Sequence, residues 1–444
     1  MEGAKIEQRP HVVMVPLPVQ GHIKPFLCLA QLLSQAGLYV TFVNSHYNHK
    51  RFANLSALSL QFPNLNFKSI SDGIPDDDQP RDILSYAFFH GMKFAGRAHL
   101  KQLIGTLGRR SELPPVTCVI GDGNISFPVE VAEELGIPVF SFCGHSAHFL
   151  LAFLCIPKLI EDGQLPYEDG NMDHEVNGVD GLEGVILNTI DELEAPCITP
   201  ITNSCGRSYT IGPLHALLNS QIGHRSQLIA SHGSIWKTQH SCMTWLDSQP
   251  SRSVLYVSFG SIVKTSTSQL LELWKGLVDS GYAFLWVVRL DMLKEDDEEH
   301  HGVPEELQMG PQERGYIVDW APQEEVLNHD AVGGFLTHGG WNSILESILA
   351  GIPMISWPQF GDQRINSECI RKVWRIGVEL EAFDRWTIQK TISTFMETSR
   401  REELQRSVDM VAKWARDSVG HGGSSYNNFE VLVEDIKKIS KHSE

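Results

Sequence analysis

Apolar runs near the start of the chain have the lengths of buried strands joined by a helix. Residues 11–18 (HVVMVPLP) form a nearly continuous apolar run of strand length. Pro25 then opens a helix that Gly37 ends, and residues 39–44 (YVTFVN) form the next strand. Strands buried on both faces pair in parallel through a crossover helix. The pattern therefore predicts a βαβ unit, the opening of a doubly wound α/β sheet.

The same alternation continues through the first half of the chain. Strand-length runs follow at residues 116–120, 137–143, 185–189 and 209–214, with helices at 127–136 and 149–156 between them. Residues 215–240 are rich in Ser, His and Gln and show little periodicity, which is typical of an interdomain linker. We therefore expect a first α/β domain over residues 1–240, with the linker at its end.

A second α/β series follows the expected linker. Its predicted elements are helix 242–249, strand 254–261, helix 268–281, strand 283–289, strand 315–320 and helices 386–396 and 402–419. The acidic stretch 291–301 is expected to be solvated surface. After the Gly-rich break GHGGSS, an amphipathic helix at 427–440 ends the chain. These patterns predict a second domain over 241–424 and a separate helical segment over 425–444.

Composition narrows the functional classes. The 444 residues carry a formal net charge of −18, which argues against a nucleic-acid or anionic-membrane partner. The polar start MEGAKIEQRP is unlike a signal peptide, and the longest apolar run, around 149–156, is too short to cross a bilayer. Eight cysteines without CxxC or CxH pairing are typical of reduced thiols rather than zinc ligands or disulfides. We expect a cytoplasmic protein without a metal site.

Residues 320–363 contain a predicted anion-binding turn. A strand at 333–338 leads into Gly339–Gly340 and a helix that opens at Asn342–Ser343. The free N–H groups and the dipole of such a helix favour a negative charge at its start, and the glycine pair allows close approach of a phosphate. The motif is neither GxGxxG nor GxxxxGK[ST], so neither standard nucleotide fingerprint applies.

Side chains near this turn fit a nucleotide that carries a polyol. Trp320 offers a flat face for a base, and Glu346, expected on the first turn of the helix, can accept two hydrogen bonds from a ribose diol. Asp362 and Gln363 follow a strand and can hold a second polyol. Each residue alone fits a structural role. Their combination at these spacings favours a binding site.

The segment 320–363 resembles, nearly position for position, the signature box of the plant family 1 UDP-sugar glycosyltransferases. It contains their opening Trp-Ala-Pro-Gln, the core His-x-Gly-Trp-Asn-Ser-x-x-Glu and the closing Asp-Gln, with Gly339 replacing a usual Cys or Ser and Gly361 replacing Ala. The resemblance implies that Trp320 stacks on uracil, that Gln323 and Glu346 hold the ribose, that His338, Asn342 and Ser343 bind the diphosphate, and that Trp341, Asp362 and Gln363 hold the sugar. Ala321 and Ser261 complete the implied UDP-sugar site.

The resemblance covers nearly the whole chain and also implies a fold. Members of this family have the GT-B arrangement, two facing doubly wound Rossmann-like domains with a cleft between them. Their terminal helix packs back on the first domain. UDP-glucose is then the expected co-substrate, with no cofactor and no metal, and a monomer is the expected state.

A candidate catalytic pair lies in the first domain. His22 follows the first strand and Asp122 ends the strand at 116–120, and open α/β sheets bind ligands at the carboxyl ends of their strands. A histidine can take a proton from an attacking hydroxyl near neutral pH, and a carboxylate on its other nitrogen fixes the tautomer. Alone, His22 is a common loop histidine and Asp122 a common turn former. The resemblance implies that they are the family's catalytic dyad, which transfers the sugar with inversion.

The sequence predicts fewer residues of the acceptor site than of the UDP-sugar site. His145 and His148 are weak candidates for its lining. The chain most resembles the terpenoid and iridoid glucosyltransferases, including those acting on 7-deoxyloganetic acid, which implies a small lipophilic acceptor. However, the segment 166–185 contains fewer residues than the corresponding segment of the family, which normally forms a wall of the acceptor pocket. A UDP-sugar-binding protein with weak or lost transfer is therefore the alternative. A sugar-nucleotide epimerase or phosphorylase is a third alternative, but neither activity explains why the segment ends in Asp362–Gln363.

Overall fold

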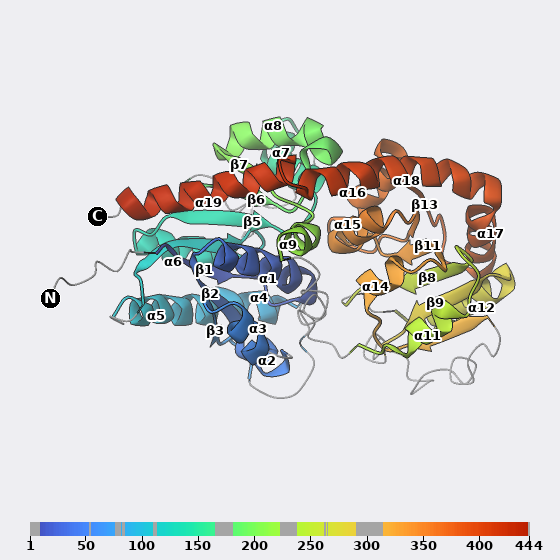
Figure 1. Cartoon of the computed structure of the whole chain (residues 1–444), viewed down its shortest axis with the longest axis horizontal. Coiled ribbons are helices and arrows are strands. Elements are labelled where there is room, and N and C mark those ends of the chain that lie inside the picture. Colours follow the sequence, from blue (N-terminus) through green and yellow to red (C-terminus); the bar gives the residue numbers. More distant parts are fainter. Residues whose placement is uncertain are drawn as a thin grey trace. The chain divides into compact units, whose positions relative to one another are not determined.

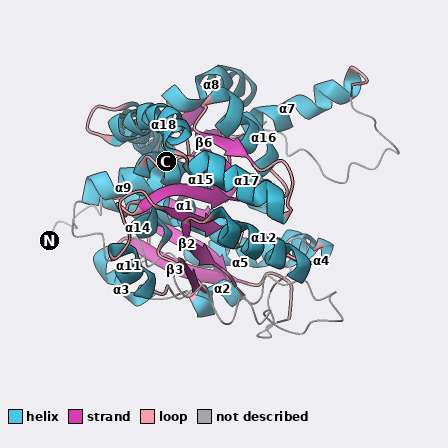
Figure 2. Ribbon diagram, turned by 90° about the vertical axis from the view of Figure 1, so that its right-hand side faces the viewer, coloured by secondary structure: helices cyan, strands magenta, loops and turns pink. Residues whose placement is uncertain are grey.

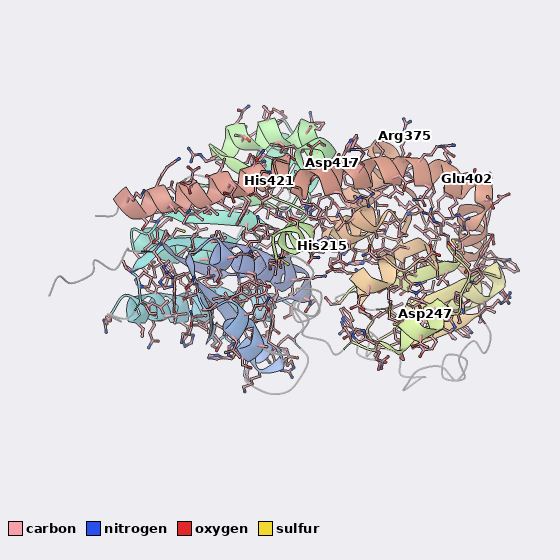
Figure 3. The ribbon with its side chains drawn as sticks, viewed as in Figure 1. His215, Asp247, Arg375, Glu402, Asp417 and His421 are labelled. Carbon is pink, nitrogen blue, oxygen red and sulfur yellow. The ribbon has the colours of Figure 1, made fainter. Side chains whose placement is uncertain are left out.

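The chain folds into two compact units (Figure 1). The computed structural model describes residues 9–52, 55–75, 81, 85–109, 113–164, 181–222, 238–261, 263, 265–289 and 314–442. The first unit comprises Met1–Ile235 with Asp417–Glu444, and the second comprises Trp236–Arg416. The sequence placed these two boundaries at 240 and 424. The second division falls inside helix α18 (Thr398–Val419), so Asp417, labelled in Figure 3, belongs to the first unit.

The first unit is built on a parallel sheet of seven strands in the order β3-β2-β1-β4-β5-β6-β7. The strand order reverses between β1 and β4, so the first unit has its topological switch point there. The strands are β1 (His11–Val15), β2 (Tyr39–Ser45), β3 (Leu65–Ile70), β4 (Val116–Asp122), β5 (Val139–Cys143), β6 (Gly184–Leu187) and β7 (Ser208–Thr210).

Helices connect and cover these strands (Figure 2). They are α1 (Gln20–Gln35), α2 (His46–Arg51), α3 (Leu55–Gln61), α4 (Tyr86–Gly91), the π-helical turn η1 (Met92–Gly96), α5 (Arg97–Leu107), α6 (Phe127–Glu134), α7 (Ala147–Glu161), α8 (Asp191–Cys205), α9 (Leu214–Ile222) and α19 (Ser424–His442). The C-terminal helix α19 binds back onto the sheet of this unit. Its Asp435 Oδ2 accepts hydrogen bonds from Arg207 Nη1 (2.7 Å) and from the Tyr209 hydroxyl (3.0 Å) of β7.

The first helix begins earlier than the sequence suggested. We expected a loop up to Pro25, but α1 starts at Gln20 and contains Pro25. The backbone N–H groups of His22 and Ile23 donate to the Val19 carbonyl at 3.0 and 2.9 Å, which closes the first turn. Pro25 lies on the second turn of α1, where its missing N–H removes one backbone hydrogen bond without ending the helix, so it did not mark the start. His22 therefore lies in the first turn of a helix and not in a loop.

Two further segments of the first unit differ from expectation. The helix expected at 149–156 is longer and starts at Ala147, with Ser146 as a capping residue. The expected linker begins with α9, whose Leu214, Leu217 and Leu218 are buried at helical spacing. Residues 223–237 of the linker lie outside the described residues, as do the acidic stretch 291–301 and residues 165–180 of the shortened segment.

The second unit repeats the same plan with six parallel strands in the order β10-β9-β8-β11-β12-β13. The order reverses between β8 and β11, which gives a second switch point. The strands are β8 (Val254–Ser258), β9 (Ala283–Val287), β10 (Gly315–Val318), β11 (Val332–Thr337), β12 (Met354–Ser356) and β13 (Gly377–Glu379). The helices are α11 (Ser241–Asp247), α12 (Thr267–Ser280), α14 (Gln323–Leu327), α15 (Trp341–Ala350), α16 (Gln363–Glu368), the π-helical turn η5 (Cys369–Val373), α17 (Arg385–Met396) and most of α18.

Apolar residues on one face of the second sheet form a core cluster with residues of α12 and α17, and the strand residues include Leu255, Val257, Trp286, Leu336 and Ile355. Within the described part of the chain, no helix has both the length and the apolar character that crossing a membrane requires.

Candidate active site

The two candidate catalytic residues of the first unit contact each other at its switch point. Asp122 is the last residue of β4, and His22 lies in the turn of α1 that follows β1. The distance from His22 Nδ1 to Asp122 Oδ2 is 2.8 Å. The Asp122 side chain is fully buried, whereas the His22 side chain keeps 19% of its surface exposed. The pair therefore presents only its imidazole to the surface.

Backbone groups hold the Asp122 carboxylate in place. Oδ2 also accepts a hydrogen bond from the Leu17 N–H at 3.0 Å, and Oδ1 accepts one from the Asn124 N–H at 3.0 Å. Because a carboxylate only accepts, His22 donates its Nδ1–H to Asp122. The proton of a neutral His22 ring is thus on Nδ1, and Nε2 is the basic atom. This is the geometry of a general base oriented by a carboxylate.

A second histidine–carboxylate pair lies at the start of α7. The distance from His148 Nδ1 to Glu194 Oε1 is 2.7 Å, and Glu194 has no exposed surface. The same carboxylate accepts hydrogen bonds from the backbone N–H groups of Ala147 (2.8 Å) and His148 (3.0 Å). Glu194 itself sits at a kink in α8, with φ −124° and ψ 24°. The sequence indicated His148 but not its partner, because Glu194 is one of several acidic residues in DELE.

His145 is placed differently from His148. Its ring contacts Phe149 edge-on, with the two centroids 4.9 Å apart, and its Nδ1 lies 3.3 Å from the Ser146 carbonyl oxygen.

In the second unit, His338 follows β11 and packs between two glycines. A Cβ on Gly260, which has φ +73°, would lie 2.7 Å from His338 Cε1, and a Cβ on Gly340 would overlap its Nε2. Only glycine at both positions leaves room for the ring. Burial lowers the pKa of His338 to about 4, so the ring is neutral near pH 7. It can donate one hydrogen bond to a diphosphate but carries no positive charge there.

The residues implied for the ribose form one hydrogen-bonded cluster. Gln323 Nε2 donates to Glu346 Oε2 at 2.7 Å and to Ser343 Oγ at 3.1 Å. Tyr256, a residue of β8, donates its hydroxyl hydrogen to Gln323 Oε1 at 3.2 Å. Glu346 and Ser343 lie on one face of α15, but because α15 starts at Trp341, Glu346 is on its second turn and not its first. The cluster fixes the orientation of the Glu346 carboxylate.

The residues implied for the sugar are tied to the turn after β11. Asn366 Nδ2 donates both to the Gly339 carbonyl (2.9 Å) and to Asp362 Oδ2 (2.8 Å). Gln363 Oε1 accepts from the backbone N–H groups of Gln359 (2.9 Å) and Phe360 (3.2 Å), so its oxygen is used within the loop. The Trp341 ring is buried beside Trp374, and any sugar contact by Trp341 must use its backbone.

Each set of implied residues thus comes together within one unit. His22 and Asp122 meet in the first unit, whereas the residues of 320–363 and Ser261 lie in the second. Ala321 is buried directly after Trp320. Among the described residues, no group of three or more His, Cys, Asp or Glu side chains could hold a metal ion.

Comparisons with known proteins identify the class. Residues 9–216 match the family model for the N-terminal domain of glycosyltransferases, and residues 224–399 match that for UDP-glucuronosyl and UDP-glucosyl transferases. The crystal structure of Os79 from O. sativa with UDP superposes with a TM-score of 0.81 at 26% identity, covering 96% of this chain and 100% of that one. UGT71G1 from Medicago truncatula with UDP-glucose gives 0.77 at 25% identity, covering 98% and 100%. The protein is a glycosyltransferase with the GT-B fold.

Curated relatives place the chain more narrowly. Mogroside I-A1 synthase from Siraitia grosvenorii is 41% identical over 476 residues, covering 98% of this chain and 90% of that protein. The 7-deoxyloganetic acid glucosyltransferase from Catharanthus roseus is 42% identical over 477 residues, covering 97% and 98%. The chain belongs to the plant family 1 UDP-glycosyltransferases and is a UDP-glycosyltransferase. Both alignments are longer than the 444 residues of this chain, so the relatives contain positions that it lacks.

Proposed function

We propose that this enzyme transfers glucose from UDP-glucose, with inversion, to a hydroxyl or carboxyl group of a small lipophilic plant metabolite. The observation that carries the proposal is the 2.8 Å hydrogen bond between His22 and the buried Asp122 at the switch point of the first sheet. The donor is proposed from the names of relatives, which include glucosyltransferases acting on 7-deoxyloganetic acid and on a myricetin rhamnoside. A terpenoid, iridoid or phenolic acceptor follows from the same names.

In the proposed reaction, His22 Nε2 takes the proton of the acceptor group. The acceptor oxygen forms a bond to the anomeric carbon as the bond from that carbon to the diphosphate oxygen breaks, and UDP leaves. Asp122 holds the Nδ1–H and stabilises the imidazolium that forms, and base catalysis of this kind contributes about 10²–10⁴-fold. A single displacement converts an α-linked donor into a β-linked product.

The residues around α15 are proposed to bind the donor. Trp320 stacks on uracil, and Gln323 positions the Glu346 carboxylate for the ribose hydroxyls. The leaving diphosphate is stabilised by the N-terminus of α15, with Asn342, Ser343, Ser261 and the neutral His338 as hydrogen-bond donors. Asp362 and Gln363 hold the glucose hydroxyls. The scheme uses neither a metal ion nor an organic cofactor.

The second candidate is a GT-B protein that binds UDP-sugar with weak or lost transfer. The length of the alignments favours it, because residues that relatives possess are missing from this chain. Incubation with UDP-glucose and a panel of phenols and terpenoid acids, followed by mass spectrometry, separates the two. We expect a product heavier by one glucose residue. UDP binding with no glucosylated product from any acceptor would favour the alternative.

We also propose that the enzyme acts as a cytoplasmic monomer. All eight cysteines are free, seven of them buried, which fits a reducing compartment. Sedimentation at several protein concentrations tests the oligomeric state, and a concentration-dependent increase in mass would contradict the monomer.

A further inference from the structure

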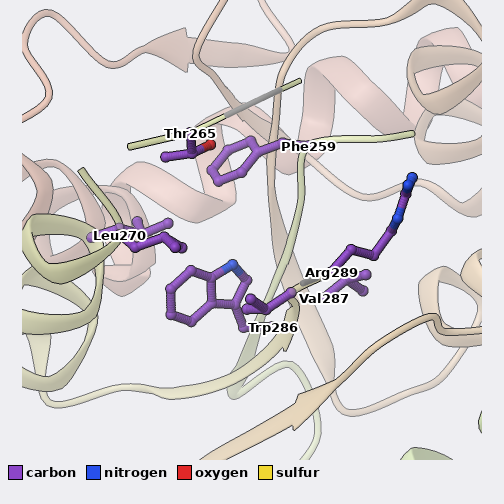
Figure 4. A pocket seen from close by; sticks show the side chains of 8 residues that line it. Phe259, Thr265, Leu270, Trp286, Val287 and Arg289 are labelled. Carbon is purple, nitrogen blue, oxygen red and sulfur yellow. The ribbon is translucent and has the colours of Figure 1, made fainter. Parts of the chain in front are cut away.

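Arg289 is a buried cation beside the residues that are proposed to bind UDP-glucose. It belongs to none of the motifs found in the sequence. It lies two residues after the end of β9, and only 7% of its surface is exposed. Figure 4 shows its side chain leaving the strand end in a different direction from the indole of Trp286. A small cavity of about 10 Å³ lies between these residues and Leu270, with room for roughly one water molecule.

The sheet order brings Arg289 between two turns of the donor site. β9 lies between β10 and β8, and its pairing with β10 continues past the strand end through the hydrogen bond from Val288 N to Val318 O (2.9 Å). Arg289 Nη1 donates to the Ser261 carbonyl at 2.9 Å, in the turn after β8. Its Cζ lies 5.8 Å from the centroid of the Trp320 ring, in the turn after β10. One guanidinium therefore contacts both turns.

A planar guanidinium can make both contacts at once in a fixed arrangement, which the compact ammonium group of lysine is less suited to do. The guanidinium is planar, stacks on aromatic rings and presents several N–H donors in a fixed arrangement. A cation within about 6 Å of an indole is attracted by its π-system, and the attraction grows when the pair is desolvated. The Ser261 turn is also fixed on its other side, because Gly260 packs against His338. Arg289 completes the support of that turn.

We propose that Arg289 is a positioning residue for the nucleotide, which holds the Trp320 ring at the angle needed to stack on uracil and ties it to the Ser261 turn. The inference rests on the proposed role of Trp320 in donor binding. It assigns Arg289 to recognition of the nucleoside, not to the charge of the diphosphate. Losing the guanidinium should thus weaken the binding of uridine as well as that of UDP.

The test compares Arg289→Gln and Arg289→Lys with Arg314→Gln as a matched control. Arg314 also donates to a backbone carbonyl, that of Gly281 at 3.2 Å, but at the start of β9 and on an exposed surface. Dissociation constants for uridine and UDP are measured by calorimetry on the full chain, with KM for UDP-glucose and kcat alongside. We expect Arg289→Gln to weaken both ligands by about tenfold, a change that corresponds to ~1.4 kcal/mol. KM should rise while kcat at saturating donor stays within about threefold. Arg314→Gln should change neither.

Arg289→Lys keeps the charge and the apolar stem, so it guards against loss of folding in the glutamine variant. It should weaken both ligands nearly as much. Full UDP affinity in the lysine variant, or a loss confined to UDP, would show that charge matters rather than the planar group and would overturn the inference. Trp320→Ala distinguishes the two levels of failure. If it weakens UDP and Arg289→Gln does not, only this inference fails. If it leaves UDP affinity unchanged, the proposed donor site fails, and the inference fails with it.

Discussion

At the scale of single residues, three histidines with different surroundings show how environment sets chemistry. His22 and His148 each donate Nδ1–H to a buried carboxylate, at 2.8 and 2.7 Å. His338 instead packs between glycine backbones, and burial lowers its pKa to about 4. The first arrangement suits a base that becomes charged during reaction, whereas the second keeps the ring neutral.

The depressed pKa of His338 predicts a loss of stability in acid. In the unfolded chain this histidine takes up a proton below about pH 6.5, while in the folded chain it stays neutral down to about pH 4. The loss of folding free energy that results from this difference is therefore absent above pH 6.5 and grows as the pH falls towards 4. It reaches about 2 kcal/mol at pH 5. We expect His338→Gln to reduce the difference in Tm between pH 7 and pH 5, measured by calorimetry.

His421→Gln, which changes an exposed histidine of the first unit, serves as the control for the His338 experiment. If His338→Gln and the unmodified enzyme lose the same amount of Tm between the two pH values, burial of this ring does not account for acid sensitivity.

The site could be predicted from the sequence only in part. The segment 320–363 brings its residues together locally, and Gln323, Ser343 and Glu346 do form one cluster. His22 and Asp122 are separated by 100 positions. Their places at two strand ends of one sheet made them candidates, and the family resemblance implied that they act as a pair. Glu194 and Arg289 escaped detection because their contacts depend on a kink in α8 and on strand order, which no local pattern contains.

At the scale of elements, the alternation of apolar runs was enough to predict two parallel sheets but not the starts of helices. Pro25 suggested the start of α1, yet the backbone closes a turn at Val19 before it. The apolar pattern predicts no element between residues 45 and 115, where β3 pairs at the sheet edge and η1 adds a π-helical turn. Partly buried edge strands and short helices lack a long apolar run. Whether they form depends on the neighbouring elements that they pair with or pack against.

The start of α7 provides a test of an element that depends on one distant side chain. Replacing Glu194 with Ala leaves the N–H groups of Ala147 and His148 without their carboxylate acceptor. Hydrogen bonds to a charged group are worth about 1.5–3 kcal/mol each, and their effects are not fully additive. We expect Glu194→Ala to lower the free energy of unfolding of the first unit by about 2–4 kcal/mol in urea.

Glu192 on the same helix α8 is the matched control, because it is exposed and hydrogen-bonds only Ser424 Oγ among the contacts described. Glu192→Ala should cost less than about 0.5 kcal/mol, as surface substitutions usually do. Equal losses in the two variants would show that the buried carboxylate does not stabilise α7.

At the scale of the whole molecule, the residues proposed to bind UDP and those proposed to act on the acceptor lie in different units. A shortening in one unit should therefore affect the binding of only one substrate. The residues implied for UDP lie in the second unit, and the proposed catalytic pair lies in the first. Residues 166–185 belong to the first unit, so their shortening should leave the donor residues unchanged. The acceptor depends on apolar enclosure, in which each buried methylene is worth about 0.8 kcal/mol.

We therefore expect normal UDP affinity combined with weak acceptor saturation. A few lost contacts raise the KM of the acceptor by an order of magnitude or more, because ~1.4 kcal/mol is tenfold. Easier access of water should also increase hydrolysis of UDP-glucose relative to transfer. Calorimetry with UDP, saturation kinetics with the best acceptor and assay of free glucose measure the three quantities. Tight acceptor saturation without hydrolysis would show that other residues enclose the acceptor.

We propose that His22, oriented by Asp122, is the base of a glucosyl transfer. The most direct test is turnover of UDP-glucose and the best acceptor by His22→Ala, with UDP affinity measured on the same preparation. We expect kcat to fall ~10²–10⁴-fold while the dissociation constant of UDP stays nearly unchanged. A His22→Ala variant that binds UDP normally and keeps more than about half of the turnover would show that His22 is not the base.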